Sequence, residues 1–165
     1  MKTAAAVIDA LERAPSIIVP LVREVPESIL KWRPAPGKWS AHEHACHLAV
    51  VHRLFFDRLD AMLAKPHPVF RPYDPAADDP DDRLSKLDLD ESLRMFVEDR
   101  RRLVARLRTL SADDWERTAV HGEYSHYGML IMFRHVALHD FFHAYRIEQC
   151  LLTKWKSGEV EGVEK

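Results

Sequence analysis

The sequence predicts an all-α protein, a four-helix bundle with a long crossover between its second and third helices. Two observations predict this class: apolar residues recur three or four positions apart in four long segments, and no segment alternates between apolar and polar residues as a half-buried strand would. The chain has 165 residues, 47% of them hydrophobic and 30% charged, which is typical of one soluble globular domain. We expect that domain to cover residues 1–155, with a frayed tail over residues 156–165.

The first helix is expected close to the N-terminus. Its apolar residues fall three or four positions apart, at Val7, Leu11, Ile18, Leu21, Val22 and Val25. Pro15 and Pro20 lie inside this segment. Because proline has no backbone N–H and its ring crowds the preceding turn, we expect the two prolines to bend or interrupt the helix.

The second helix is predicted for about residues 41–64. The stretch before it, "WRPAPGKWS", contains two prolines and Gly37, which exclude a regular element. Ser40 and Glu43 then form the S-x-x-E pattern of a capping box, which starts a helix by satisfying its free amide groups. Helical projection places a row of residues on the core side, with His47 near the edge of the same face: His44, Leu48, Val51, Phe55, Leu59 and Met62.

The crossover and the last two helices follow. Residues 65–87 contain five prolines and many aspartates, so we expect a long irregular connection that would let the second and third helices run parallel. The third helix is marked by Leu89, Leu93, Phe96, Val97, Leu103, Val104 and Leu107. The fourth is expected over about residues 130–152, with Ser125 as its N-cap.

Charge and composition exclude several classes of function. The net charge of −2 gives no overall attraction to nucleic acid or to an anionic membrane, and the run of residues 100–102, all arginine, is expected to be a solvated helix face. Charged residues interrupt the N-terminal apolar run before a signal peptide could form, and no segment reaches membrane-spanning length. We therefore expect a cytoplasmic protein without a nucleic-acid or membrane partner. Cys46 and Cys150 have no metal or disulfide spacing and are expected to be buried thiols.

The stretch "HVALHDFFHAY" carries the clearest chemical signal. His135, His139 and His143 recur every four residues and project onto one face of the fourth helix, which we expect to point inward with Leu138, Phe142 and Cys150. The second helix supplies two more histidines on its core side. Two imidazoles one helical turn apart, joined by a third from a facing helix, can hold a metal ion and leave one coordination position open, as in catalytic sites.

The alternative is a group of core histidines satisfied by hydrogen bonds, the common arrangement for a single histidine on an apolar face. Burying several imidazoles without partners costs roughly 1–3 kcal/mol each. A shared metal or a hydrogen-bond network must therefore offset this cost. The clustering of five histidines favours the metal site.

Two segments resemble a known family. "LKWRPAPGKWSAHEHACHLA", residues 30–49, and "LHDFFHAYRIEQ", residues 138–149, are similar to the DinB-like (DinB/YfiT) superfamily in order and spacing, and the W-S-x-x-E-x-x-x-H motif is fairly specific. The resemblance implies a four-helix bundle with a long crossover, typically a homodimer, with a three-histidine site for a divalent metal. It implies His47, His139 and His143 as the ligands, with His44 and His135 as their neighbours.

The chain departs from the family at Arg146, near which many members have glutamine. Arg146 projects onto the same stripe as the histidines of the fourth helix. There its guanidinium could bind a carboxylate of a substrate or of a thiol cofactor. The alternative is that it pairs with a nearby acid, such as an aspartate of the crossover.

The resemblance implies a metal-dependent transferase or hydrolase, with thiol transfer or related chemistry on a small molecule. We expect His135 or His44 to shuttle a proton or support the ligands, Glu43 to cap the second helix and orient an imidazole, and Arg146 to anchor the substrate. Arg146 and His44 would also contact a low-molecular-weight thiol. Three imidazoles favour zinc or nickel, and iron or manganese also fit. The alternative function is a dimeric bundle that binds a metal or ligand without turnover.

Overall fold

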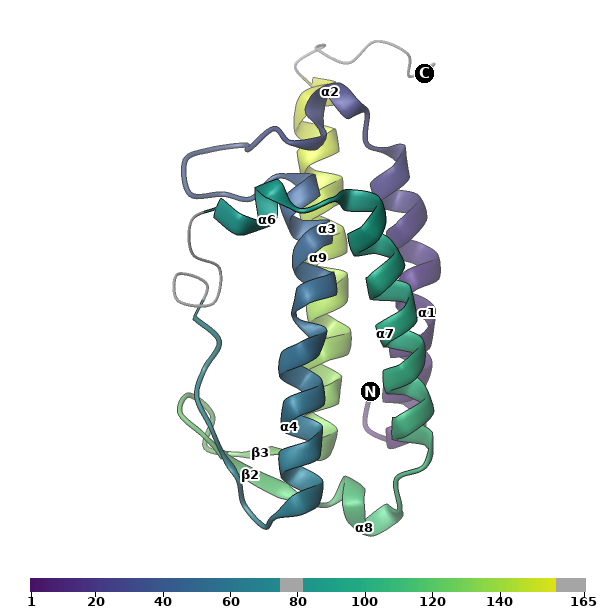
Figure 1. Ribbon diagram of the computed structural model, residues 1–165, viewed down its shortest axis with the longest axis vertical. Coiled ribbons are helices and arrows are strands. Elements are labelled where there is room, and N and C mark those ends of the chain that lie inside the picture. Colours follow the sequence, from purple (N-terminus) through teal and green to yellow (C-terminus); the bar gives the residue numbers. More distant parts are fainter. Residues whose placement is uncertain (75–81, 157–165) are drawn as a thin grey trace.

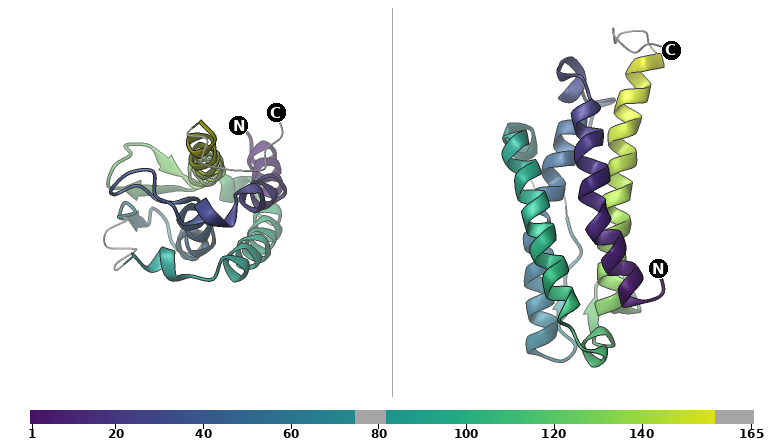
Figure 2. Two further views of the ribbon diagram at one scale, coloured as in Figure 1. Left: turned by 90° about the horizontal axis from the view of Figure 1, so that it is seen from above. Right: turned by 90° about the vertical axis from the view of Figure 1, so that its right-hand side faces the viewer.

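The computed structural model describes residues 1–74 and 82–156, and it confirms the all-α bundle (Figure 1). Its long helices are α1 (Ala4–Glu24), α3 (Ala41–Val50), α4 (His52–Ala64), α7 (Leu89–Arg108) and α9 (Met129–Lys156). Helices α3 and α4 follow one another along the same side of the bundle, so together they form its second member. In Figures 1 and 2, α1 and α9 run in one direction while α3, α4 and α7 run in the other. The second and third members are therefore parallel, as the long crossover allows.

Helix α1 is continuous through both of its prolines. A row of buried residues three or four positions apart packs this helix into the core: Val7, Leu11, Ala14, Ile18 and Val22. Pro15 removes the intrahelical partner of the Leu11 carbonyl, which instead accepts a bond from Nη1 of the buried Arg100 over 3.3 Å, and Pro20 removes that of Ser16, an exposed residue. The expectation that these prolines interrupt the helix is wrong, because burial of the opposite face outweighs their local effect.

The second predicted helix has the expected limits but is divided at Val51 into α3 and α4. Its capping box is confirmed, since the Ser40 hydroxyl accepts a bond from the Glu43 backbone N–H and the Glu43 carboxylate accepts one from the Ser40 N–H.

The third predicted helix is confirmed as α7, which is capped by Asp88. Cys46 and Cys150 are both buried and unpaired, as predicted.

The connections contain short elements that the sequence analysis did not predict. They include the helices α2 (Glu27–Leu30), α6 (Arg83–Lys86) and α8 (Ala112–Trp115) and a small sheet of β1 (Val69–Phe70), β2 (Thr118–His121) and β3 (Tyr127–Gly128). Strand β1 pairs with β2 in parallel and β2 with β3 in antiparallel. The crossover thus carries β1 and α6, and its residues 75–81 lie outside the described part of the chain.

Because the hairpin of β2 and β3 precedes it, the fourth bundle helix begins later than its predicted N-cap. Helix α9 begins at Met129, directly after β3, so the assignment of Ser125 as its N-cap is wrong. The backbone N–H of Met129 donates to the carbonyl of Arg117, which attaches the helix start to the chain leading into β2. A Cβ at Gly128 would lie 2.7 Å from the same carbonyl oxygen, so this close approach requires glycine.

A buried ion pair joins α7 to α9. Arg100 is 1% exposed and Asp140 fully buried. The guanidinium binds the carboxylate through both of its terminal nitrogens, with 3.0 Å between Nη2 and Oδ1. Nε of Arg100 also donates to Nε2 of His52 over 3.0 Å. Residues 100–102 were expected to form a solvated helix face. This is confirmed for Arg101 and Arg102, which are exposed, and wrong for Arg100, whose partner is a buried carboxylate.

No helix in the described ranges combines enough length and apolar character to cross a membrane.

The pH dependence of stability provides a test of the buried network at His52. Burial, and after it the charge of Arg100, lowers the pKa of His52 to about 3 from an ordinary value of 6.5. Because the unfolded chain takes up this proton near pH 6.5 and the folded chain only near pH 3, this contribution to stability is present above pH 6.5 and is lost as the pH falls. We expect the slope of unfolding free energy against pH, measured by urea titration, to decrease in His52→Gln by up to ~1.4 kcal/mol per pH unit.

Glutamine keeps an oxygen that can accept the bond from Arg100. The matched control is His126→Gln at an exposed position, which should leave the slope as in the wild type. Equal slopes in the wild type and His52→Gln would contradict this interpretation.

Candidate metal centre

Three histidines meet between α3 and α9, which pack against each other. His47 comes from the second turn of α3, and His139 and His143 from adjacent turns in the middle of α9. The capping box that starts α3 and the ion pair from α7 to α9 hold these helices in place. The convergence expected from the sequence is therefore present in the structure.

The ring nitrogens of the three histidines lie close together. Nε2 of His139 is 3.0 Å from Nε2 of His47 and 3.0 Å from Nε2 of His143. One potential ligand atom from each residue lies within 4.8 Å of the others. Ligands bound tetrahedrally at ~2.1 Å from a zinc ion are roughly 3.4 Å apart. The three nitrogens thus fit a four-coordinate divalent ion with one position left open.

The outer nitrogens of two of these rings have polar neighbours. Nδ1 of His143 lies 2.8 Å from Nδ1 of His44, and Nδ1 of His47 lies 3.5 Å from the hydroxyl of Tyr73 in the crossover. Nδ1 of His139 is buried without a hydrogen-bond partner. A histidine that binds a metal through Nε2 carries its proton on Nδ1. Nδ1 of His44 is therefore placed to accept a hydrogen bond from the Nδ1–H of His143.

Burial keeps all of these imidazoles neutral. It is the main reason that the pKa of His47 falls to about 3 and those of His44 and His139 to about 4, and it holds the pKa of His143 far below its usual range. Positive charge on neighbouring side chains acts in the same direction, for example Arg146 on His44. Neutral imidazole is the form that binds metal ions, so the site needs no deprotonation near pH 7.

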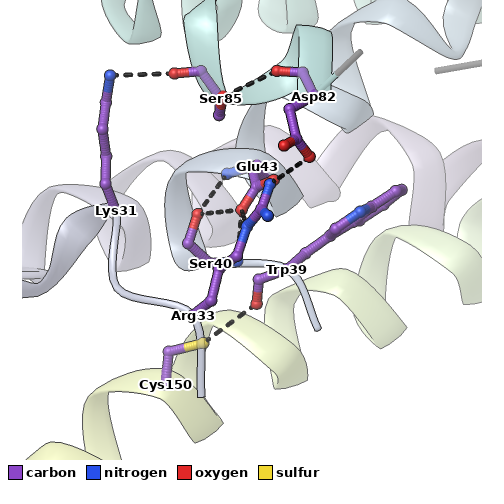
Figure 3. Close-up of polar contacts among 8 residues, drawn as sticks. All are labelled: Lys31, Arg33, Trp39, Ser40, Glu43, Asp82, Ser85 and Cys150. Atoms are coloured by element: carbon purple, nitrogen blue, oxygen red, sulfur yellow. Dashed lines mark hydrogen bonds and ion pairs between the residues drawn. The ribbon is translucent and has the colours of Figure 1, made fainter. Parts of the chain in front are cut away.

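Glu43 lies one residue before His44, and its carboxylate bonds to residues other than the imidazoles. Its Oε2 accepts bonds from the hydroxyl of Ser40 over 2.7 Å and from Nε of Arg33 over 2.8 Å (Figure 3). Burial alone would raise the pKa of Glu43, but the bonds from Arg33 and Ser40 hold it below its ordinary value. Glu43 thus caps α3 as predicted, and the expected role in orienting an imidazole finds no contact in the described residues.

Arg33 is the partner that the sequence analysis missed. Its Nη2 also bonds Asp82 over 2.8 Å, so it links the start of α3 to the end of the crossover (Figure 3). A buried glutamate at a helix cap requires a cation to offset its desolvation, and the proline-rich stretch before the cap contains only Arg33 and Lys38 as candidates. The signal was therefore present in the sequence.

His135 does not join the cluster. It is exposed, and the rings of His135 and Tyr124 meet edge to face at 5.9 Å. Leu138 and Phe142, expected to point inward, are 55% and 50% exposed. At about 100° per residue, the buried residues of α9 fall in a single arc centred to one side of His139, and Leu138 and Phe142 lie more than about 100° from the centre of that arc. The arc contains Met132, Val136, Asp140, His143, Ile147 and Cys150.

Arg146 is exposed and lies beside a cavity next to the histidines. Its Nη1 donates to the side-chain oxygen of Gln149 over 2.8 Å, and the guanidinium lies 5.0 Å from the ring centre of Phe142. The alternative, a pairing with an aspartate of the crossover, is not seen among the described residues. The cavity, of about 690 Å³, is lined by Arg146, His44 and Trp39 among others.

Comparisons with known proteins agree with this architecture. Residues 10–147 match the model of the DinB superfamily. Among solved structures, the chain is similar to YfiT from Bacillus subtilis, described as a probable metal-dependent hydrolase with an unusual four-helix bundle topology. The two are 23% identical with a TM-score of 0.82, over 97% of this chain and 90% of YfiT. A comparison with curated proteins found no match. The likeness to YfiT establishes the fold.

The cap at the start of α3 can be tested through stability. Glu43→Gln keeps the size of the side chain but removes the charge that faces Arg33. We expect the free energy of unfolding to fall by about 1.5–3 kcal/mol, the range for a hydrogen bond to a charged group, in guanidinium titrations. Glu27→Gln, at an exposed position in the first turn of α2, should change it by less than ~0.5 kcal/mol. Equal effects of the two substitutions would argue against the cap.

Proposed function

The chain belongs to the DinB superfamily, and from this premise we propose that it is a metal-dependent enzyme whose divalent ion is held by His47, His139 and His143. One observation carries the proposal: three neutral imidazoles from two helices, those of His47 and His143 buried and that of His139 half-buried, direct Nε2 atoms at one point, with 3.0 Å between neighbours. A hydrogen-bonded cluster without metal is less favourable, because Nε2 of His139 has two nitrogen neighbours and a neutral ring has only one N–H to share.

A divalent ion bound by three neutral imidazoles remains a strong Lewis acid and makes a bound thiol or water nucleophilic near neutral pH. Zinc or nickel suits such a nitrogen site best, and iron or manganese also fit. The protein's own contribution is to hold the three rings in the right tautomer and to shield the site from water.

His44 supports this site by fixing the orientation of His143. When Nδ1 of His143 carries the proton, it donates to Nδ1 of His44 over 2.8 Å and leaves Nε2 free for the ion. His44 then carries its own proton on Nε2. Trp39 covers the same side, with its ring centre 4.9 Å from that of His47 and 6.0 Å from that of His143.

We propose transfer of a small thiol to an electrophile as the reaction. An ion held by the three imidazoles would lower the pKa of a bound thiol, so that its proton would pass to solvent near neutral pH and no carboxylate base would be required. This suits a centre at which no carboxylate of the described residues bonds to the three imidazoles. Hydrolysis is the second candidate, favoured by the likeness of the fold to YfiT and by the description of YfiT as a probable metal-dependent hydrolase.

The resemblance to the family also supports two further features, and we propose that the protein acts as a homodimer on a small-molecule substrate. From the charge pattern of the sequence we propose that it works in the cytoplasm. His135, which lies outside the group of His47, His139 and His143, has no part in this mechanism.

Metal content tests the ligand set. Wild-type protein prepared without a histidine tag should bind about one divalent ion per chain by elemental analysis, and His139→Ala or His143→Ala should bind less than about a tenth of that, because two imidazoles hold an ion much more weakly than three. His126→Ala removes an exposed histidine outside the site and should retain the metal. Full metal content in His139→Ala, with helicity intact by circular dichroism, would contradict the assignment.

Turnover separates the candidate functions. Metal-loaded wild type should conjugate an electrophile such as chlorodinitrobenzene with one of a panel of low-molecular-weight thiols, and His139→Ala should lose this activity with its metal. Release of acid from ester or amide substrates without thiol would favour hydrolysis instead. Bound metal with neither reaction would favour a bundle that binds a metal or ligand without turnover.

A further inference from the structure

We propose that the cavity beside the three histidines binds an organic anion with a flat apolar body, such as an aromatic carboxylate or sulfonate. The inference that this anion is the substrate rests on the proposed function, whereas the binding itself does not. The cavity lies between the loop of residues 34–39 and the C-terminal half of α9, and its volume of about 690 Å³ is typical of small-molecule sites.

The cavity is next to the proposed metal centre. His44 lines it, and Nδ1 of His44 is 2.8 Å from Nδ1 of His143. Trp39 lines it as well and packs its ring against that of His47. His44 and Trp39 thus contact both the cavity and the proposed metal centre.

The charge of the lining is positive. Lys38 and Arg146 contribute to it, and the lining contains no aspartate or glutamate. Neither cation forms an ion pair with a carboxylate of the described residues, and the hydrogen-bond partner of Arg146 is the neutral amide of Gln149. The chain as a whole carries a net charge of −2. The local excess of positive charge favours an anion over a neutral or cationic ligand.

The aromatic side chains define the rest of the ligand. Trp39, Phe142 and Tyr145 line the cavity, and Phe142 and Tyr145 are 50% and 61% exposed. Flat rings stack favourably on such side chains. Arg146 lies over the ring of Phe142, so its planar guanidinium can meet an acidic group at the edge of a stacked ligand. An inorganic anion would leave these rings uncovered.

A pair of fluorescent probes tests the binding. Anilinonaphthalene sulfonate is flat and anionic, and phenylnaphthylamine has a similar body without the charge. We expect Arg146→Gln to weaken binding of the sulfonate about tenfold, and Lys38→Gln to weaken it by a smaller factor, because each removes one cation from the lining. The neutral probe should change by less than about twofold in both variants.

Arg13→Gln is the matched control, since Arg13 is exposed on α1 and does not line the cavity. It should bind the sulfonate as the wild type does. Unchanged sulfonate affinity in both cavity variants, or equal losses in the control, would overturn the proposal. Metal content is measured on the same samples, so a failure of the metal site is seen separately from a failure of the anion site.

The substrate role is tested by kinetics with an electrophile that carries an aromatic carboxylate. Arg146→Gln should raise its KM about tenfold with little change in kcat, while a neutral electrophile of the same shape keeps its KM. An unchanged KM for the anionic electrophile would show that the cavity is not the substrate site, even where metal and turnover are both present.

Discussion

The ion pair between Arg100 and Asp140 is the constraint on which the arrangement of the site depends. Both groups are buried, so neither helix can slide or rotate without leaving a charge unpaired in the core, which is strongly destabilising. Asp140 directly follows His139 in α9. The pair therefore fixes the rotation of α9 about its axis, and with it the direction in which His139 and His143 face α3.

Local signals made much of the fold predictable. The Ser40–Glu43 capping box places the start of α3 within three residues, and the apolar period gives the extent of α7. The sequence alone determined less well which three histidines form the metal site. Spacing left His44 and His135 as equal candidates, and only the family resemblance separated them from the other three. Their meeting point depends on how two helices pack, which a single helical projection does not contain.

The remaining features depend on partners far away in the chain. Arg100 looked like part of a solvated run because its carboxylate is forty residues later. The strands β1 and β2 are too short to show alternation, and their pairing joins Val69 to Val120. The misplacement of Leu138 and Phe142 has a different cause, because the projection was centred on the histidines of α9, whereas the buried residues of this helix are centred to one side of them.

Arg33 connects two segments with contacts of unequal strength. Its contact with Glu43 is to a carboxylate only 2% exposed, whereas Asp82, its other partner, is 66% exposed. An exposed ion pair contributes less than about 1 kcal/mol, so the contact with Asp82 adds little to stability, whereas loss of the contact with Glu43 would leave a buried carboxylate without its cation. The helix cap therefore owes its strength to the burial of Glu43 rather than to the number of partners that Arg33 has.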